Sequence, residues 1–422
     1  MKLSGPILAM AAALALSGSG AAQLLPPVGG AIGQTIGGVT ERVGRIGDRL
    51  DDSVDQAGGA IGRLARDRLG RIDALVRANP QALEYDARGD AAVKGELILL
   101  DPDPAALRAA MAAGFAVEEQ GDLAGLGIAA ARLRVPASMD LARAEKLLRR
   151  IAPGATVQSN PVYQTSGEAA APARAAPAAS APGPGAPIGM IDGGVARHPA
   201  LPDGIVQRGF AAGAPAPGNH GTAVASILVG RGAVRGVSPR SRLLAADVYG
   251  RDPRGGNALA IARALGWLAQ SGAAVVNISL AGPDNALLAR AVAAASGKGL
   301  LLVAAVGNDG AASPPAYPAS YPQVIAVTGI DAKRRVLIEA GKASHVDFAA
   351  PGADLLAAKA DGGTARLRGT SYAAPFITGR LARLSAGGPL PRARAVALLA
   401  AEATPAKGRA GRGIICMDCA TR

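Results

Sequence analysis

The chain has 422 residues, 49% hydrophobic and 3% aromatic, with a formal net charge of +13. The apolar majority excludes a disordered chain, and the length suffices for two or three domains with cores built mainly from Ala, Val, Leu and Ile. The whole charge excess lies in residues 186–422, which hold 26 Lys and Arg against 13 Asp and Glu. The arginines are scattered and no aromatic residues interleave with them, so we expect a solvated surface and no nucleic-acid partner.

Residues 1–22 have the composition of a signal peptide. Lys2 precedes an apolar run from Ile7 to Leu16, and the small residues SGSGAA follow. The run is shorter than the about 20 apolar residues that cross a bilayer, and no later stretch qualifies as a span. The sequence therefore predicts export to the periplasm or the extracellular space, with no transmembrane segment in the mature chain.

Residues 23–90 are rich in Gly, Ala and Arg. Apolar residues between Ile32 and Val76 are spaced mostly by three and four, which is the period of one helical face. Several glycines interrupt this face, and each costs roughly 1 kcal/mol relative to Ala within a helix. We interpret the segment as a pro-segment that is amphipathic and helical or partly disordered; a helical hairpin or a partner-binding stripe is the alternative.

Residues 91–164 alternate strand and helix patterns in the order βαββαβ, which predicts a small α+β, ferredoxin-like domain. Pro104 suits the first turn of one helix, and Ser138 or Asp140 can cap the other. Residues 165–186 are rich in Ala and Pro, which predicts an extended, protease-accessible linker.

From residue 187 to residue 422, apolar strand patterns alternate with helical ones. This alternation predicts an α/β fold with a mostly parallel, doubly wound sheet that helices cover on both faces. Ligands of such sheets bind at the carboxyl ends of the strands. The polar residues expected at or near those ends are Asp192, Asn277, Ser279 and Asn308.

The stretch RGTSYAAPFITG contains the candidate nucleophile, Ser371. A serine hydroxyl needs an adjacent base, a group that orients the base, and donors for the developing oxyanion. Candidates for these roles are His220 in GNHGTAVAS, Asp192 at the end of the apolar run PIGMID, and Asn308 in LLVAAVGNDG. All three precede the serine, in the order Asp, His, Asn, Ser.

These four segments resemble the subtilisin-like serine proteases (subtilases) over roughly residues 187–420. The patterns GTSxAAP, HGTxVA, IDxGV followed by HP, and AxGN occur in the order of that family. Two positions depart from its pattern, because Ala223 stands where a second histidine is common and Ser226 where a glycine is usual. Both changes are small, so we expect altered packing and retained catalysis.

The resemblance implies a serine endopeptidase that acts on protein or peptide substrates. Ser371 would attack the peptide carbonyl, His220 would transfer the proton, and Asp192 would hold the imidazole. Asn308 and the backbone N–H of Ser371 would bind the oxyanion. A catalytically silent subtilase scaffold that acts as a binding module is the alternative.

Two further histidines compete for the role of the base. His198, in the HP pair, matches a structural position of the family, and His345 lies outside every motif. Neither is therefore expected to act on the serine.

The resemblance also implies substrate binding by strand addition along the cleft. The edge and wall of the primary pocket are expected at Ser279, Leu280, Ala281, Ala304, Ala305 and Gly307. These small wall residues predict an open pocket for a medium or large apolar side chain. No cofactor is expected to be required, and calcium binding through backbone carbonyls is left open because no EF-hand-like acidic loop is present.

Immediately upstream of a subtilase domain, residues 91–164 resemble the inhibitory propeptide of the family, which leaves its C-terminal strand in the cleft. The resemblance predicts a zymogen whose own propeptide is an intramolecular inhibitor and that cuts itself after Gln164 or within the next few residues. An unrelated ferredoxin-like domain is the alternative for this region.

Cys416 and Cys419 lie three positions apart near the end of the chain. In an exported protein such a pair forms a local disulfide or remains as two thiols. Two cysteines do not make a structural zinc site, so we favour a structural role.

Overall fold

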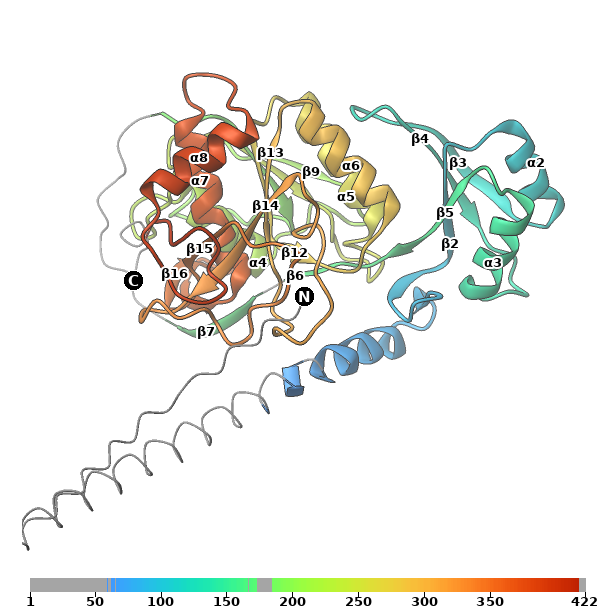
Figure 1. Cartoon of the computed structure of the whole chain (residues 1–422), viewed down its shortest axis with the longest axis horizontal. Helices are drawn as coiled ribbons and strands as arrows, with labels where there is room; N and C mark the ends of the chain where they lie inside the picture. The colour runs from blue at the N-terminus through green and yellow to red at the C-terminus, as the bar shows by residue number, and fades with distance from the viewer. Residues whose placement is uncertain (1–58, 60–61, 65, 166, 173–183, 417–422) are drawn as a thin grey trace, which may run out of the picture. The chain divides into compact units, whose positions relative to one another are not determined.

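The structure, a computed structural model, describes residues 59, 62–64, 66–165, 167–172 and 184–416. They all lie in one compact unit, Gly58–Arg422, which contains a large and a small sheet (Figure 1). The predicted signal peptide, most of the predicted pro-segment and Cys419 lie outside the described residues. Within the described part, no helix has the length and apolar character needed to cross a membrane.

The large sheet has seven parallel strands in the order β15-β14-β13-β11-β8-β10-β9. Its strands are β8 (Ile188–Asp192), β9 (Val206–Gly209), β10 (Leu243–Asp247), β11 (Val275–Ile278), β13 (Leu301–Ala305), β14 (Val324–Ile330) and β15 (Phe348–Pro351). Every strand except the edge strand β9 is buried along its whole length. The predicted α/β class with a doubly wound parallel sheet is confirmed.

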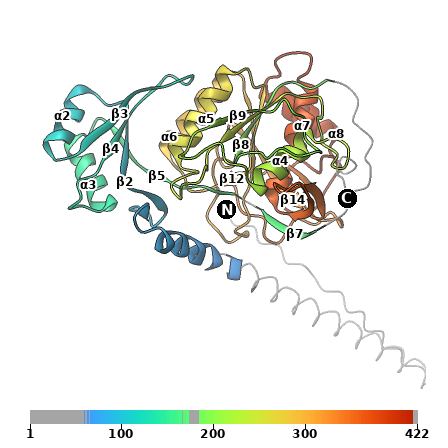
Figure 2. The same ribbon diagram turned by 180° about the vertical axis from the view of Figure 1, so that it is seen from behind.

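Helices cover both faces of this sheet because alternate strand residues point to opposite sides. In β13, Leu301 and Val303 pack on one face, and Leu302 and Ala304 on the other. The first face is covered by α4 (Asn219–Val229) and α7 (Ala374–Leu384), and the second by α5 (Ala258–Gln270) and α6 (Ala286–Gly297). Figures 1 and 2 show the two helical layers from opposite sides.

The small sheet is antiparallel and precedes the large one in the chain. Its elements are β1 (Leu83–Tyr85), β2 (Ala91–Leu100), α2 (Pro104–Ala112), β3 (Ala116–Leu123), β4 (Ile128–Arg134), α3 (Leu141–Ile151) and β5 (Thr156–Pro161). Strand β2 pairs with β5 and β4, and β3 pairs with the far side of β4. This is the arrangement of a ferredoxin-like βαββαβ unit, to which β1 adds a short strand.

Local sequence accounts for the starts of both helices on this sheet. The carboxylates of Asp103 and Asp140 accept hydrogen bonds from the N–H groups of Ala106 and Arg143, at 2.6 and 2.8 Å. Such caps satisfy donors that the helix itself leaves unpaired. Pro104 occupies the first turn, as predicted, and the cap of α3 is Asp140.

The small sheet packs on α5 and α6 (Figures 1 and 2). At Gly266 of α5 the backbones approach so closely that a Cβ would lie 2.1 Å from the carbonyl oxygen of Ala124. An ion pair of 2.5 Å joins Arg263 to Glu119, and another joins Arg290 to Asp101. Because a side chain at position 266 would separate the two parts, glycine is required there.

Several elements have no counterpart among the predicted ones, among them β9, β15, β16 (Leu355–Ala358), β17 (Thr364–Arg368) and α8 (Arg392–Glu402). The strands among them have four or five residues, too few for a clear period. Ser371 lies in a 3₁₀ turn, η1 (Thr370–Tyr372), and α7 begins at Ala374.

Two antiparallel strand pairings lie outside the large and small sheets. Strand β6 (Gln164–Thr165) pairs antiparallel with β12 (Leu280–Ala281), and β7 (Glu168–Pro172) pairs antiparallel with β17. The predicted linker over 165–186 thus contains a paired strand, and its residues 173–183 lie outside the described part.

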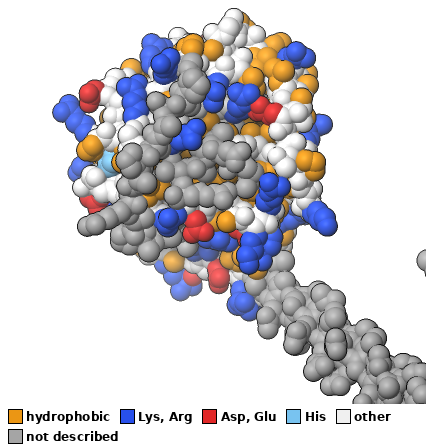
Figure 3. Space-filling view, turned by 90° about the vertical axis from the view of Figure 1, so that its left-hand side faces the viewer, with side chains coloured by type: hydrophobic (Ala, Val, Ile, Leu, Met, Phe, Trp, Pro, Cys, Tyr) orange, Lys and Arg blue, Asp and Glu red, His pale blue; other side chains and the backbone are white. Residues whose placement is uncertain are grey.

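Basic side chains are spread over the surface. On the face shown in Figure 3, Lys and Arg groups are scattered with a few Asp and Glu groups between them. Many of the basic residues form ion pairs, for example Arg335 with Asp331 at 2.7 Å and Arg380 with Glu402 at 2.6 Å.

Candidate active site

Asp192 and His220 form an acid–imidazole pair. Asp192 is the last residue of β8 and is completely buried, and His220 lies in the first turn of α4. The imidazole Nδ1 lies 2.9 Å from both carboxylate oxygens of Asp192, and the N–H of Gly193 donates to the same carboxylate at 2.7 Å. Because a carboxylate can only accept, Nδ1 carries a proton, and in the neutral imidazole Nε2 keeps a lone pair.

The other ring nitrogen of His220 is placed to accept a proton. Nε2 is buried and has no hydrogen-bond partner among the described residues. The ring of Tyr372 packs against the imidazole, with 5.3 Å between ring centroids. A buried, unsatisfied imidazole nitrogen is costly in a purely structural residue, so its persistence indicates a functional one.

Ser371 lies in the turn between β17 and α7. Gly369 begins this turn with φ 142°, a region that side chains disfavour, and Pro375 occupies the first turn of α7. The Ser371 hydroxyl donates to the carbonyl oxygen of Ser279 at 3.0 Å, and the Ser279 hydroxyl donates to the carbonyl oxygen of Ser371 at 2.8 Å.

Asn308 follows β13 by three residues and faces the same turn. Its side-chain oxygen accepts hydrogen bonds from the backbone N–H and the hydroxyl of Thr370, both at 3.0 Å. The amide oxygen is thereby held toward Thr370, so the NH₂ group points away from it and is a candidate donor. Gly307 precedes it with φ 83°, which allows the chain to turn sharply after the strand.

The remaining histidines have other partners. His198 Nε2 lies 2.9 Å from the carbonyl oxygen of Gly363, and its Nδ1 accepts from the N–H of Ala200. His345 Nε2 lies 3.1 Å from the carbonyl oxygen of Val324 and 3.4 Å from Asp347. Both histidines therefore serve local structure in this arrangement.

The two departures from the family pattern are accommodated by packing. Ala223 is buried in the core of the face that α4 covers. The Ser226 hydroxyl donates to the carbonyl oxygen of Ala223 at 2.7 Å and accepts from the N–H of Ala358 at 3.0 Å. The extra hydroxyl thus links α4 to β16.

Of the residues expected to bind substrate, Ala281 lines a cavity of about 890 Å³, and the other five do not. Leu280 and Ala281 form β12, with Ser279 directly before them, while Ala304 and Ala305 are buried in β13 and Gly307 follows it. The cavity is lined by Gln164, Thr165, Ala281, Pro315, Asn308 and Arg68, among others. Residues of the chain itself thus occupy one side of the expected substrate cleft.

Tyr163 anchors this part of the chain. Its side chain is fully buried, and its hydroxyl donates to the carbonyl oxygen of Pro283 at 2.7 Å. Its backbone N–H donates to the carbonyl oxygen of Gly256 at 2.8 Å, and its carbonyl oxygen accepts from the Tyr249 hydroxyl at 3.1 Å. Burial raises the pKa of Tyr163 well above its ordinary value, so the hydroxyl remains a neutral donor.

From Tyr163 the chain continues across the cleft. Thr165 pairs with Leu280, and Gly167 lies so close to the ring of Tyr372 that a Cβ would be 2.5 Å from it. Glu168 then pairs with Arg368, three residues before Ser371. The segment therefore pairs with the protein on both sides of the serine.

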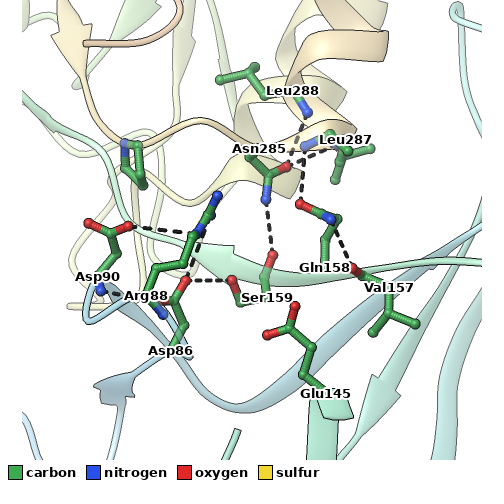
Figure 4. Close-up of polar contacts among 12 residues, drawn as sticks. Asp86, Arg88, Asp90, Glu145, Val157, Gln158, Ser159, Asn285, Leu287 and Leu288 are labelled. Carbon is green, nitrogen blue, oxygen red and sulfur yellow. Dashed lines mark hydrogen bonds and ion pairs between the residues drawn. The ribbon is translucent and has the colours of Figure 1, made fainter. Parts of the chain in front are cut away.

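Side chains of β5 cap two helices of the large sheet. Gln158 accepts at its side-chain oxygen from the N–H of Ala286 in α6, at 3.1 Å, and Asn160 accepts from the N–H of Leu259 in α5, at 3.0 Å. Figure 4 shows the α6 end, where the Asn285 side chain donates to the carbonyl oxygen of Ser159 at 3.1 Å. These bonds satisfy first-turn N–H groups that lack helical partners.

A helix over residues 66–78 lies beside Asn308 and the residues that follow it. Arg68 lies 3.4 Å from Asp309, the residue after Asn308, and Arg71 pairs with the same carboxylate. Leu64 lies against Gly310. This part of the predicted pro-segment is therefore ordered and ion-paired beside the candidate oxyanion donor.

Cys416 is disulfide-bonded. Across the described ranges, no group of three or more His, Cys, Asp or Glu residues could hold a metal ion.

The sequence model of the subtilase family matches residues 183–407. The chain belongs to the subtilase family. It is 35% identical over 207 residues to Subtilisin BL of Lederbergia lenta, which covers 47% of this chain and 75% of that protein. It is 38% identical over 217 residues to the thermophilic serine proteinase of Bacillus sp. (strain AK1), which covers 48% of this chain and 53% of that protein. This subtilase is thus a subtilisin-like serine endopeptidase.

A solved structure extends the similarity in fold. Fervidolysin from Fervidobacterium pennivorans, described as a keratinolytic enzyme related to subtilisin, matches with a TM-score of 0.66 at 19% identity. The match covers 80% of this subtilase and 62% of that chain. Because the family model spans only about half of the chain, the shared fold includes residues before 183.

Sequence reasoning missed three residues of the site. Thr370 holds Asn308, the Tyr372 ring packs on His220, and Arg368 pairs with β7. Thr370 and Tyr372 flank the serine within the same motif, so their proximity could have been inferred. The pairing of Arg368 has no local signal.

Proposed function

We propose that this subtilase is an exported serine endopeptidase made as a zymogen, which cuts itself between Ser166 and Gly167. The observation that carries the proposal is the segment that crosses the cleft, with Thr165 paired to Leu280 on one side of Ser371 and Glu168 paired to Arg368 on the other. Subtilases bind substrates by such strand addition. The residues up to Ser166 then act as the intramolecular inhibitor.

Ser371, His220 and Asp192 would carry the acyl transfer. The Ser371 hydroxyl turns from the Ser279 carbonyl toward Nε2 of His220, gives it the proton, and attacks the peptide carbonyl. Asp192 stabilises the imidazolium through Nδ1. The imidazolium returns the proton to the leaving amine, and water then releases the acyl group by the same steps.

Asn308 would stabilise the charge that develops on the carbonyl oxygen. Its NH₂ group and the backbone N–H of Ser371 are the two donors of this oxyanion hole. The two hydrogen bonds from Thr370 fix the orientation of the amide, so little reorganisation is needed in the transition state.

The register of β6 supports the choice of the bond that is cut. Gln164 pairs with Ala281 and Thr165 with Leu280, so β6 runs antiparallel to β12 toward Ser279, the residue before Leu280. Ser279 exchanges hydrogen bonds with the nucleophile, so we assign the cut to the Ser166–Gly167 bond, between the pairings of Thr165 and Glu168. Holding this bond beside the nucleophile makes the cleavage intramolecular and fast.

Maturation by the wild type and by Ser371→Ala tests the proposal in a host that lacks other proteases. Wild-type protein is expected to separate into two parts, with Gly167 at the new N-terminus by Edman sequencing, and to react with a fluorophosphonate at Ser371. Ser371→Ala should accumulate uncut, whereas the exposed control Ser344→Ala should mature normally. Cleavage of Ser371→Ala at the same site would refute self-processing. A wild type that neither matures nor labels would favour the silent binding scaffold.

Export rests on the signal-like composition of residues 1–22. Fractionation of cells into cytoplasm, periplasm and culture fluid, followed by N-terminal sequencing of the precursor, tests it. A protein that stays in the cytoplasm with Met1 still at its N-terminus would contradict export.

A further inference from the structure

The helix over residues 66–78 turns one face toward the pro-part of the chain, the residues up to Ser166. Three of its apolar side chains pack in a small cluster with Val162 and two residues of the small sheet; these five are Ile72, Leu75, Val76, Leu83 and Ala91. The Tyr85 hydroxyl donates to the Asp73 carboxylate at 2.7 Å. Because Val162 directly precedes Tyr163, the helix is fixed at the root of the segment that crosses the cleft.

A second stripe of this helix faces the part of the chain that contains Ser371. Leu64, Arg68 and Arg71 are four and three positions apart, which places them on one side of a helix. Arg68 and Arg71 both pair with the Asp309 carboxylate. A Cβ built on Gly310 would lie 3.0 Å from the Cβ of Leu64, so glycine at position 310 lets the Leu64 side chain lie against the backbone.

The two residues that receive the helix are well placed for it. Asp309 directly follows Asn308, and the N–H of Gly310 donates to the carbonyl oxygen of Glu339 at 2.9 Å. Asp309 is an acid in a part of the chain that has 26 Lys and Arg against 13 Asp and Glu. Its charge is thus opposite to that of its surroundings and complementary to the two arginines of the helix.

The helix also forms a wall of the cavity of about 890 Å³. Leu69 and Ile72 line this cavity together with Ala281 and Asn308. A substrate that approaches Asn308 from this side needs the space that the helix encloses. The pairing of β6 with β12, in contrast, extends over only two residues.

We propose that Asp309 and Gly310 form a docking site for the helix over residues 66–78, and that the docked helix is a second inhibitory element, separate from the paired segment. The cut between Ser166 and Gly167 breaks none of the helix contacts. While the helix stays docked, the segment that ends at Ser166 is held near Ser371 at a high effective concentration and rebinds after each release. Activity therefore appears only when the helix has left. The inference rests on the proposed function, because this delay is counted from that cut.

Two sets of substitutions in the same helix test the inference. The docking set removes the side chains that reach the docking site, and it consists of Leu64→Ala, Arg68→Gln and Arg71→Gln. The control set removes charges from exposed positions of the helix, and it consists of Arg66→Gln and Arg77→Gln. Both sets remove two positive charges, so a difference between them reports the contact with Asp309 and Gly310.

Amide hydrogen exchange in uncut Ser371→Ala protein tests the docking site without any catalysis. Exchange at residues 309–316 should rise at least fivefold with the docking set, because the helix no longer protects this loop. With the control set it should stay within twofold of the parent protein.

Kinetics with Ser371 intact test the inhibition. The lag is the time between the cut, followed by gel electrophoresis, and the first hydrolysis of a short peptide. The docking set should shorten this lag at least fivefold, while the rate of the cut stays within twofold of wild type. The control set should change neither quantity.

The outcomes separate this inference from the proposed function. Unchanged exchange at residues 309–316, or equal lags for the two sets, would overturn the docked helix as an inhibitor while leaving the protease intact. A docking-set protein that is cut more than twofold more slowly would show that the helix supports folding of the pro-part, and this too would overturn the inference. A wild type that is never cut would contradict self-processing, whereas the exchange result would still decide the docking site.

Discussion

Ser279 and Ser371 exchange hydrogen bonds across the site: each hydroxyl donates to the backbone carbonyl oxygen of the other residue, at 2.8 and 3.0 Å. The Asn277 side chain donates to the Ser279 hydroxyl at 2.8 Å, and the Thr378 hydroxyl lies 3.1 Å from the Asn277 amide oxygen. All four residues are buried. The turn that carries the nucleophile is therefore tied to the end of β11 and to α7.

Ser279→Ala should destabilise the enzyme and slow it. The change leaves the Ser371 carbonyl and the Asn277 NH₂ group without this partner, and an unsatisfied buried group costs about 1–3 kcal/mol. Thermal unfolding should show a lower Tm, and kcat should fall about tenfold because the turn is less well held. The exposed Ser344→Ala is the matched control, expected within about 0.5 kcal/mol of wild type. Equal Tm values for the two variants would contradict the role of the network.

His220→Ala should abolish peptide hydrolysis, lowering kcat/KM by about 10⁴-fold or more, because the Ser371 hydroxyl loses its base. His345→Ala should leave kcat/KM within about tenfold, since that histidine contacts Val324 and Asp347. Steady-state kinetics of both variants on one peptide decides which histidine is the base. Activity that survives in His220→Ala and disappears in His345→Ala would reverse the assignment.

Asn308→Ala should lower kcat and leave KM nearly unchanged, because the donor acts mainly on the transition state. Removal of such a donor in subtilisin costs about 10²–10³ in kcat, and we expect a similar loss here. Thr370→Val keeps the hydrogen bond from the backbone N–H to Asn308 and removes the one from the hydroxyl. This change should lower kcat about tenfold. An effect of Asn308→Ala confined to KM would show that the residue only helps to bind substrate.

Asp309→Asn should loosen the cleaved pro-part from the enzyme. The change removes the ion pairs with Arg68 and Arg71, each worth roughly 0.2–1 kcal/mol at a partly exposed site. Activity should therefore appear two- to tenfold sooner after the cut, and less pro-part should co-purify. The difference should shrink in 0.5 M salt, which screens the pairs. Asp331→Asn, which removes an ion pair with Arg335, is the control. Identical lag times for both variants at low salt would contradict the role of the Asp309 ion pairs in holding the pro-part.

His345 should make stability depend on pH. Its hydrogen bond to Asp347 raises the pKa of His345. Burial pushes the pKa of Asp347 up, but hydrogen bonds from His345 and the N–H of Ala326, with the nearby charge of Arg392, outweigh it and leave this pKa lowered. The His345 contribution is therefore complete below about pH 6.5 and is lost as the pH rises through the folded pKa, and the Asp347 contribution is lost as the pH falls below about 4.

Urea unfolding from pH 5 to pH 8 measures this contribution, in a Ser371→Ala background that prevents autolysis. Since His345 is partly exposed, the free energy of unfolding should fall by less than about 1 kcal/mol over this range. His345→Gln should flatten the profile. A variant profile parallel to that of wild type would show that another group titrates.

Much of this protein could be read from neighbouring residues in the chain. Runs such as Leu301–Ala305 are apolar at every position because helices cover both faces of the sheet, so the α/β class follows from pattern alone. The caps of α2 and α3 lie within three residues of the N–H groups that they satisfy. The candidate catalytic residues stand in short motifs whose order is itself a signal.

Contacts between distant segments were decided only by the tertiary structure. Backbone groups are nearly identical at every position, so no local pattern shows that β7 pairs with β17 and leaves the chain lying across Ser371. The ion pair of Arg71 with Asp309 joins residues 238 positions apart, and either charge alone resembles any other on a basic surface. Which atoms meet depends on how the sheet and helices bring these segments together, and that packing is a property of the whole chain.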